Sequence, residues 1–316
     1  MAREDLHAVA AALERLCPGA VRRNEPLARH VSFRIGGPAD ILVLPGTLEA
    51  LDAAVAWLYA EGLPFVVLGR GSNVLIADRG VRGVVVKTGR GQEGITYDGP
   101  RVHAESGVSV PHLSRRTAER GLTGLEFAAG IPGSVGGAVV MNAGAHGCSV
   151  ADVLVSARVR TPRGIATWTA AELAFRYRHS RLQDEPGVVL DCDLALRPQA
   201  AEEAVARLES WLRTRAESQP LGPPSSGCIF RNPDGDYAGR LIEAAGAMGL
   251  RVGGAVVSDR HANYILNSGG ATARDVLALI DAVRARVRDD AGADLATEIK
   301  MLGEFAPPNG RGHPRP

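Results

Sequence analysis

The chain contains the segment Phe65-Val-Val-Leu-Gly-Arg-Gly-Ser-Asn73, in which an apolar run leads directly into a loop with two glycines. The run predicts a buried strand, and glycines after a strand let backbone N–H groups approach a pyrophosphate without interference from Cβ atoms. The Rossmann dinucleotide fingerprint is nevertheless absent, because Val74 occupies its third glycine position and Arg90 stands where a ribose-binding acid belongs. Taken alone, such a loop is more often a tight turn than a ligand site.

A second glycine-rich segment lies about 60 residues further on and reads Gly130-Ile-Pro-Gly-Ser-Val-Gly-Gly137, with small residues continuing to Gly147. We expect neither a plain helix nor a plain strand there. A backbone with so few side chains suits a flat ring or a diphosphate lying against it, although a buried, tightly packed chain crossing would need the same residues. The two loops together favour one shared nucleotide cofactor without identifying it.

Hydrophobic periodicity in the rest of the chain predicts helices and strands that intermix. Helices are expected at 1–17, 48–61, 111–120, 200–215, 238–248 and 274–288. Strands are expected within 30–43, at 65–68, 81–87, 101–104, 153–160, 167–169, 188–196 and 299–305, and near 229, 256 and 264. Thr47 is a candidate N-cap, and Thr272 with Asp275 forms a candidate capping box. Without regular βαβ alternation, the pattern favours an α+β fold.

Length and composition indicate a globular protein with almost no net charge. The 316 residues suggest about two domains. The 45% hydrophobic and 22% charged residues exclude disorder throughout the chain. A net charge of +1 supplies no broad field for nucleic acid or anionic lipid. Lys87 and Lys300 are the only lysines, so anion recognition must fall mainly to arginine.

Cysteine usage and the apolar pattern predict a soluble cytoplasmic protein with reduced thiols. The four cysteines, Cys17, Cys148, Cys192 and Cys228, form no CxxC motif, and no His/Cys/Asp cluster has metal-ligand spacing. The first residues lack the features of a signal peptide, and no apolar run is long enough to span a membrane. We therefore expect no metal, no membrane partner, no nucleic-acid partner and a monomeric state.

Six ordered motifs between about residues 24 and 304 resemble the bacterial UDP-N-acetylenolpyruvoylglucosamine reductases. Ser32-Phe-Arg-Ile-Gly-Gly-Pro-Ala39 and the two glycine loops match the flavin-binding half of that family. Phe175-Arg-Tyr-Arg-His-Ser180, Gly227-Cys-Ile-Phe-Arg-Asn-Pro233 and Thr297-Glu-Ile-Lys300 look like its three catalytic segments, in the same order. Ser258-Asp-Arg-His-Ala-Asn-Tyr-Ile-Leu-Asn267 is similar to a further substrate-domain segment.

The resemblance implies an α+β flavoenzyme with a vanillyl-alcohol-oxidase-like, two-lobed FAD-binding domain and a C-terminal α+β substrate domain. We expect the FAD-binding domain at 1–198, with lobes of about 1–88 and 89–198, the substrate domain at 199–305 and a disordered tail at 306–316. In the implied reaction, NADPH reduces non-covalently bound FAD, and hydride from flavin N5 then reaches C3 of the enolpyruvyl ether. The product would be UDP-N-acetylmuramate, a peptidoglycan precursor. Because Arg181–Gly187 is short, the chain resembles the subgroup without an inserted tyrosine loop.

The resemblance also implies three catalytic residues. Hydride transfer to C3 places negative charge on the carboxylate side as an enolate, which Arg178 could hold with two donors and Glu298 would help to stabilise. The proton for C2 comes from a serine in most relatives, but Cys228 stands at that position here. A thiol is more acidic than an alkyl hydroxyl, so Cys228 is competent as a general acid.

The binding residues follow from the same motifs. The expected FAD contacts are Arg34, Gly69, Arg70, Gly71, Ser72, Asn73, Ala129, Gly130, Ile131, Pro132, Gly133, Ser134 and Gly136. The expected contacts to the UDP-sugar are Tyr177, Arg215, Gln219, Arg231, Asn232, His261 and Asn263.

Two other interpretations stay open from the sequence. The first is an oxidase of a small alcohol or sugar lactone on the same flavin fold. Many such oxidases bind flavin covalently through a histidine beside the first glycine loop, where this chain has Ser72-Asn73. The second is a non-catalytic protein that binds flavin or a nucleotide sugar and regulates another process.

Overall fold

The computed structural model describes residues 3–305, in two compact units. The first unit comprises residues up to Arg23, Ile41–Arg70 and Gly83–Glu217; the second comprises Asn24–Asp40, Gly71–Arg82 and the chain from Ser218 onward. This division differs from the expected boundary at 198/199, since two earlier segments belong with the C-terminal part. The expected tail at 306–316 lies outside the described residues.

The N-terminal part of the chain forms a small sheet covered by two helices. Its strands are β1 (Val21–Pro26), β2 (Pro38–Val43), β5 (Val81–Lys87) and β3 (Phe65–Leu68), in that order, with β3 and β5 parallel. The helices are α1 (Arg3–Leu16) and α2 (Leu48–Ala60), whose apolar faces bury Leu13, Leu51 and Leu58 against the strands. Thr47 caps α2 by accepting a hydrogen bond from the backbone N–H of Ala50, as expected.

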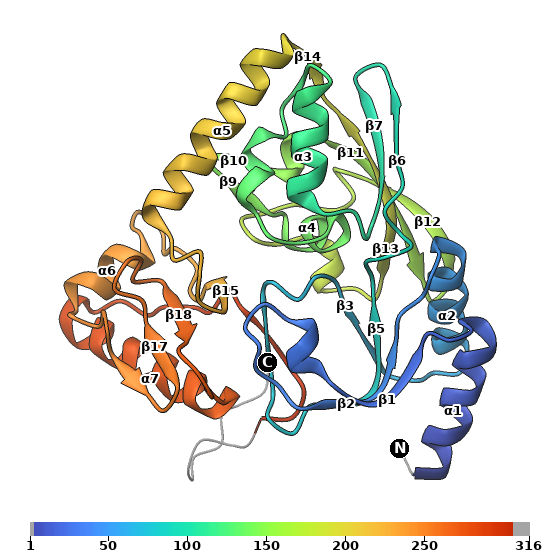
Figure 1. Ribbon diagram of the computed structural model, residues 1–316, viewed down its shortest axis with the longest axis horizontal. Coiled ribbons are helices and arrows are strands. Elements are labelled where there is room, and N and C mark those ends of the chain that lie inside the picture. The colour runs from blue at the N-terminus through green and yellow to red at the C-terminus, as the bar shows by residue number, and fades with distance from the viewer. Residues whose placement is uncertain (1–2, 306–316) are drawn as a thin grey trace. The chain divides into compact units, whose positions relative to one another are not determined.

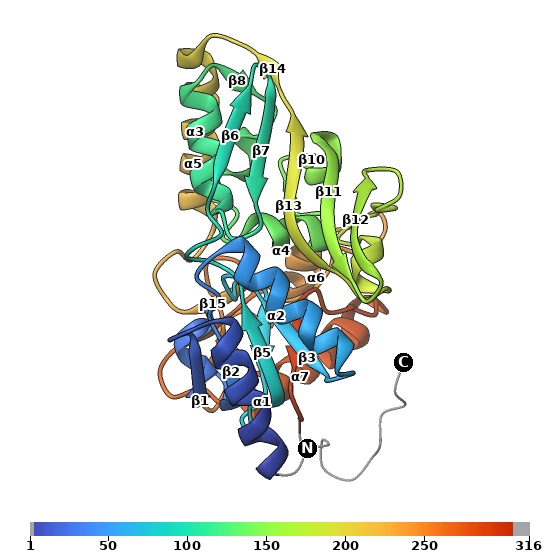
Figure 2. The ribbon, with the colours of Figure 1, turned by 90° about the vertical axis from the view of Figure 1, so that its right-hand side faces the viewer.

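The rest of the first unit is built on a five-stranded antiparallel sheet (Figure 2). Its order is β12 (Gly164–Thr169), β11 (Leu154–Thr161), β13 (Val188–Ala195), β7 (Arg101–Glu105) and β6 (Ile95–Asp98). Helices α3 (Val110–Glu119) and α4 (Val135–Met141) share one apolar core with it. Short two-stranded pairs join β9 (Gly144–Ala145) to β10 (Cys148–Ser149) and β8 (Leu122–Thr123) to β14 (Arg197–Pro198).

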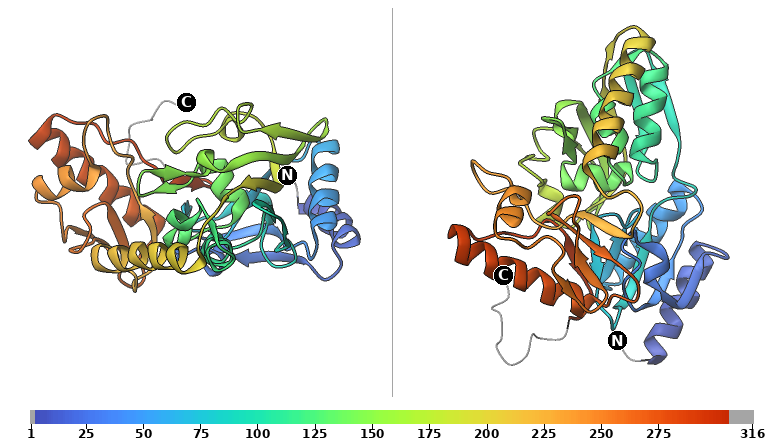
Figure 3. Two further views of the ribbon diagram at one scale, coloured as in Figure 1. Left: turned by 90° about the horizontal axis from the view of Figure 1, so that it is seen from above. Right: turned by 60° about the vertical axis from the view of Figure 1, so that its left-hand side comes forward.

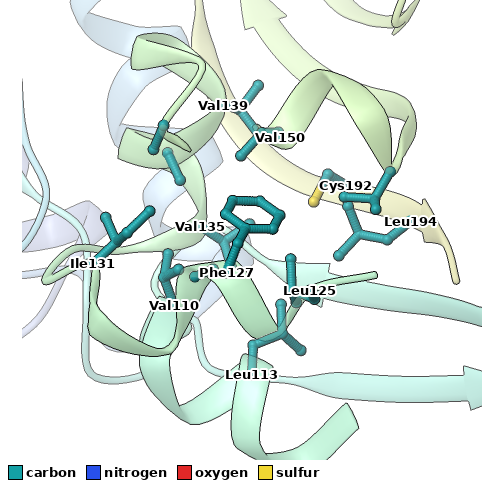
Figure 4. Close-up of a pocket in the computed structure, with 14 residues that line it drawn as sticks. Val110, Leu113, Leu125, Phe127, Ile131, Val135, Val139, Val150, Cys192 and Leu194 are labelled. Atoms are coloured by element: carbon teal, nitrogen blue, oxygen red, sulfur yellow. The ribbon is translucent and has the colours of Figure 1, made fainter. Parts of the chain in front are cut away.

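This core contains a small apolar cavity around Phe127 (Figure 4). The cavity encloses about 20 Å³, which is room for one water-sized or methyl-sized group. Val139, Val150 and the buried thiol of Cys192 are among its lining groups. Burial raises the pKa of the Cys192 thiol far above its usual value, so this cysteine stays protonated and serves as a packing residue.

Helix α5 (Ala201–Ser218) explains why the first unit extends to residue 217. It lies alongside α3 (Figure 3, right), and its Ala204 and Leu208 pack against Ala118 and Ala129. Arg207 on the same helix pairs with the buried carboxylate of Glu126 at 3.1 Å. Apolar burial and an ion pair thus attach α5 to Ala118, Glu126 and Ala129, a tertiary effect that periodicity cannot predict.

The second unit contains an antiparallel sheet and two packed helices (Figure 1). The strand order is β15 (Ser225–Cys228), β18 (Tyr264–Asn267), β17 (Ala255–Val257) and β16 (Arg251–Val252), and the helices are α6 (Ala238–Ala244) and α7 (Ala273–Ala291). A parallel pair, β4 (Val74–Ile76) with β19 (Lys300–Leu302), brings the segment after the first glycine loop to the end of the described chain. The expected capping box of Thr272 and Asp275 is present.

Several local expectations were wrong at their boundaries. The second glycine loop does contain a short helix, α4, which small residues allow to pack closely against the sheet. The strand expected near 229 ends at Cys228, and α6 stops at Ala244 because Gly246 turns with φ +63°. In the segment 30–43 only β2 is a strand; Leu27–His30 is a 3₁₀ turn.

Candidate functional site

In the first unit, the two predicted FAD loops approach each other closely. A Cβ atom added to Gly69 would lie 2.5 Å from Ser134 Oγ and 3.9 Å from the hydroxyl of Thr88. A Cβ added to Gly136 would lie 3.0 Å from the Cβ of Ser106. The two loops therefore pack with almost no room for side chains, which brings backbone and small hydroxyl groups together at this place.

Where the two loops meet, two buried hydroxyls have no hydrogen-bond partner among residues 3–305. They belong to Ser134 and Ser106, each about 1% exposed. A buried hydroxyl without a partner is unfavourable, so a polar ligand would gain by pairing with them. The N–H groups of Val135 and Gly136, in contrast, already donate to the carbonyls of Val108 and Ser106. The residues fit the polar part of a flavin cofactor, chiefly through the two hydroxyls.

Two basic side chains stand at the ends of the parallel strands β3 and β5, beside the place where the two loops meet. Lys87, paired across the strands with Leu68, is half-buried, and desolvation together with the nearby charge of Arg70 lowers its pKa. Arg70 was an expected FAD contact, whereas Lys87 was noted only as one of two lysines. Lys87 follows a buried run of β-branched residues, and this pattern was the sequence signal that could have placed it near the first glycine-rich loop.

Gly130 serves a packing role in addition to any ligand contact. A Cβ there would lie 2.5 Å from the Cδ of Arg215, which reaches this loop from α5. The structure thus places Arg215, expected as a contact to the UDP-sugar, against the second glycine-rich loop. One turn earlier on α5, Trp211 stacks on His146 with ring centroids 4.8 Å apart.

Arg178 occupies a tight turn with φ +53°. This is a left-handed backbone conformation that residues other than glycine rarely adopt. The backbones of Arg176 and His179 exchange two hydrogen bonds of 3.0 and 3.1 Å, which closes the turn. The guanidinium of Arg178 donates to the Gly144 carbonyl at 2.8 Å and lies over the exposed ring of Tyr177. Strain at a half-buried arginine is the kind of local cost that functional positions retain.

The C-terminal end of α4 holds this turn in place. Asn142 donates from its side-chain amide to the Arg176 carbonyl at 3.0 Å. Ser180 Oγ and Gln183 Nε2 both donate to the Val140 carbonyl, at 2.7 and 2.9 Å. The helix that begins at Ser134 in the flavin loop therefore ends on the Arg178 turn. Sequence analysis missed Asn142 and Gln183, because nothing in a single sequence links them to residue 178.

In the second unit, the segments that carry Cys228 and Glu298 run next to each other. Phe230 forms an antiparallel bridge with Thr297, and the N–H of Glu298 donates to the Ile229 carbonyl at 2.8 Å. Both Cys228 and Glu298 are half-buried. Backbone pairing thus brings together two of the three expected catalytic residues, which are 70 positions apart in the sequence.

The remainder of the first glycine loop joins the same neighbourhood of the second unit. Asn73 donates to the Glu298 carbonyl at 3.4 Å, and its own carbonyl accepts from the N–H of Lys300 at 3.0 Å. Gly71 has φ +68°, and a Cβ there would lie 2.6 Å from the His30 carbonyl, so chain packing already requires this glycine. Arg34, exposed, also has a left-handed backbone, with φ +55°.

The other expected substrate contacts of the second unit differ in whether their polar atoms already have hydrogen-bond partners within the protein. Gln219 accepts from the hydroxyl of the buried Tyr264 at 2.7 Å, and His261 packs edge-on against that tyrosine ring. Asn232 is exposed and accepts from the N–H of Ala238 at the start of α6. Arg231 is half-buried, and its Nε has no partner in the described chain. Asn263 is 3% exposed, and its carboxamide binds the backbone of Phe230.

Over the described residues, no group of three or more His, Cys, Asp or Glu side chains is arranged to hold a metal ion. None of the helices there combines the length and apolarity needed to cross a membrane.

Comparisons with known proteins identify the family. Residues 39–170 match the model of an FAD binding domain, and residues 219–302 match the C-terminal domain of UDP-N-acetylenolpyruvoylglucosamine reductase. The enzyme of that name from Bacillus licheniformis is 45% identical over 294 residues, covering 92% of this chain and 97% of its own. That of Bacillus subtilis strain 168 is 44% identical over 287 residues, covering 90% and 95%.

A solved structure extends this similarity to three dimensions. The crystal structure of UDP-N-acetylenolpyruvylglucosamine reductase from Thermus caldophilus superposes with a TM-score of 0.77 at 38% identity, covering 89% of this chain and 98% of that one. The expected fold class, an α+β FAD-binding fold followed by a C-terminal domain, is confirmed. With this extent of identity over nearly the whole chain, the protein belongs to the UDP-N-acetylenolpyruvoylglucosamine reductase family of FAD-binding oxidoreductases.

Proposed function

We propose that the protein reduces the enolpyruvyl ether of UDP-N-acetylglucosamine enolpyruvate to UDP-N-acetylmuramate, with NADPH as the electron donor. The observation that carries this proposal is the pairing of the Cys228 and Glu298 segments through Ile229, Phe230 and Thr297. The backbone pairing of these two segments, within the part of the chain that matches the family's C-terminal domain, supports the proposed roles of Cys228 as proton donor and Glu298 as the nearby carboxylate.

FAD, when bound, supplies the hydride chemistry that no amino-acid side chain can provide. In the first unit, the Ser134 and Ser106 hydroxyls would bind its polar groups, and Arg70 and Lys87 would balance its phosphate charge. In the second unit, Arg34, Gly71, Ser72 and Asn73 stay proposed contacts from the family resemblance. We propose non-covalent binding, since Ser72 and Asn73 stand where covalent flavoenzymes of this fold carry a histidine.

Arg178 would hold the substrate carboxylate and stabilise the negative charge that develops there as the enolate forms. Its turn is fixed by Asn142 and Gln183 before any substrate arrives, so little reorganisation is needed at the moment of reaction. Tyr177, exposed next to Arg178, stays a proposed substrate contact.

Cys228 would deliver its thiol proton to C2, and Glu298 would polarise the same intermediate. The strand that ends at Cys228 has one extra residue relative to β18, since Ser225 pairs with Leu266 and Cys228 with Tyr264. Such a bulge changes the direction of the following side chain, with Gly227 at φ +77° allowing the turn. Gln219, Arg231, Asn232 and His261 stay proposed contacts of the UDP-sugar.

One anaerobic experiment tests the proposal. Purified yellow protein is mixed with NADPH until its flavin absorbance is bleached, and the enolpyruvyl nucleotide is then added. Return of the absorbance with formation of UDP-N-acetylmuramate is expected. Bleaching without return would reject the substrate, and flavin that stays with denatured, precipitated protein would favour the covalent oxidase.

We propose a monomer that uses one site for both substrates in turn. A cytoplasmic location stays a prediction.

A further inference from the structure

Asn263 uses its whole carboxamide to hold a single residue of the Cys228 segment. Its Oδ1 accepts from the Phe230 N–H at 2.9 Å, and its Nδ2 donates to the Phe230 carbonyl at 2.8 Å. The backbone carbonyl of Asn263 accepts from the N–H of Ile229 at 2.9 Å. Both polar atoms of the side chain are engaged by Phe230, and only 3% of the surface of Asn263 is exposed, so the residue presents almost nothing to a substrate.

The opposite edge of the same segment is held by the chain around Glu298. Ile229 accepts from the N–H of Glu298 at 2.8 Å, and Arg231 donates to the Ala296 carbonyl at 2.9 Å. Residues 229–231 therefore lie between Asn263 on one side and 296–298 on the other. The position of Cys228 relative to Glu298 depends on both sets of bonds.

The β-ladder alone does not fix this position. The pairing of β15 with β18 contains the bulge between Ser225 and Cys228, and β15 ends at Cys228. Beyond that point the Asn263 side chain takes the place of a neighbouring strand, because it offers one acceptor and one donor with the spacing of a peptide group. Without it, the Phe230 N–H and carbonyl would be buried and unpaired on this side.

We propose that Asn263 is a positioning residue that sets the separation of Cys228 and Glu298, rather than the contact to the UDP-sugar expected from its motif. This inference rests on the proposed roles of Cys228 and Glu298 as proton donor and charge stabiliser.

Asn267, the last residue of β18, supplies a matched control; Asn263 immediately precedes that strand. Its Nδ2 donates to the Phe33 carbonyl at 3.1 Å, and its Oδ1 accepts from the N–H groups of Gly269 and Ala271. Its side chain thus performs the same kind of bonding to backbone groups, and none of those side-chain bonds goes to residues 227–233.

The test compares Asn263→Ala, Asn263→Leu and Asn267→Ala in full-length protein. Leucine preserves much of the volume and keeps the test valid if the alanine variant does not fold. We expect both Asn263 variants to reoxidise flavin with the enolpyruvyl nucleotide about 10–100-fold more slowly, as misplacement of catalytic groups does. KM and the rate of flavin reduction by NADPH should change less than about twofold, and Asn267→Ala should resemble wild type. A raised KM with unchanged kcat, or equal losses in the control, would overturn the inference.

A second readout needs no turnover. In a Cys148→Ser background, which removes the exposed thiol, iodoacetamide alkylation of Cys228 is followed by mass spectrometry of its peptide. Loosening of the segment should raise the alkylation rate about fivefold or more in Asn263→Leu and leave it unchanged in Asn267→Ala. Equal rates in wild type and Asn263→Leu would show that Asn263 does not position Cys228. If wild type fails to reduce the enolpyruvyl nucleotide, the proposed function falls, while this comparison still decides the positioning role.

Discussion

The side-chain amide of Gln183 lies 3.0 Å from the carbonyl oxygen of Arg178 and donates a hydrogen bond to it. The same amide donates to the Val140 carbonyl at the end of α4. The Gln183 side chain therefore connects the Arg178 turn to helix α4, which follows the second glycine-rich loop. Arg34 and Arg178, both expected functional residues, have left-handed backbones, but so do Asn24, Asn142, His146 and Ala174, so positive φ by itself does not mark function in this chain.

Arg178→Lys should slow the step with the enolpyruvyl nucleotide far more than flavin reduction by NADPH, because the enolate forms only in that step. Lysine keeps the charge but loses the planar pair of donors. We expect a loss of about 10²–10³ in the rate of flavin reoxidation, measured by anaerobic stopped flow. Arg176→Lys, two residues away on the exposed side of the turn, is the control and should remain within twofold. Equal slowing of both steps would assign Arg178 a structural role.

Cys228→Ala should still accept electrons from NADPH but stall with the enolpyruvyl nucleotide, since the proton is needed only after hydride transfer. Cys228→Ser should keep substantial activity, because a hydroxyl would supply the proton at the same position. A thiol alkylator should inactivate wild type, substrate should protect it, and the serine variant should resist. Turnover of Cys228→Ala at the wild-type rate would assign the proton to another group or to water.

Ser134→Ala should weaken FAD binding without destabilising the apoprotein. The hydroxyl is buried and lacks a protein partner in the described chain, so removing it costs the apoprotein no hydrogen bond. We expect a loss of about 0.5–1.5 kcal/mol in FAD affinity, measured by titration of flavin fluorescence. Ser114→Ala, which removes another buried hydroxyl of this kind from α3, is the control for FAD affinity. Unchanged FAD affinity in Ser134→Ala would place that hydroxyl outside the cofactor site.

Val150→Ile should stabilise the protein by filling the cavity beside Phe127 (Figure 4). One added methylene that enters this space contributes about 0.8 kcal/mol, measured by urea unfolding. Val159→Ile is the control in the same core, because Val159 is fully buried and does not line the cavity. Without that space to enter, the extra methylene should cost about 1–3 kcal/mol. Equal effects at both positions would mean that the cavity closes in solution.

Cys192 should reduce stability at high pH. Burial raises its folded-state pKa above the ordinary thiol value of 9.0, so above about pH 9 the unfolded chain releases a proton that the folded protein keeps. The contribution is therefore present below that pH and is lost as the pH rises, by at most about 1.4 kcal/mol per pH unit. Urea unfolding of wild type and Cys192→Val between pH 8 and about pH 10.5 isolates this slope, because other groups cancel. Parallel pH profiles would contradict the expected proton retention.

The sequence alone determined much of this protein, because local patterns carry that information. Alternating and helical periodicity located β3, β5, β11, β13, α5 and α7, and Thr272 with Asp275 predicted the start of α7. Side-chain chemistry and six motifs were sufficient for the family and for the assignment of Arg178, Cys228 and Glu298 as catalytic candidates, which stays a prediction.

Only the tertiary structure decided how these pieces are held. Hydrogen bonds between distant positions attach Asn73 to Glu298 and Asn263 to Phe230, and apolar burial attaches α5 to Ala118 and Ala129. Asn263 illustrates the reason. Its motif indicated a ligand contact. In the fold, the buried N–H and carbonyl of Phe230 need hydrogen-bond partners, and both polar atoms of the Asn263 side chain bind them. Which buried group needs a partner depends on three-dimensional packing, and no pattern of neighbouring residues expresses it.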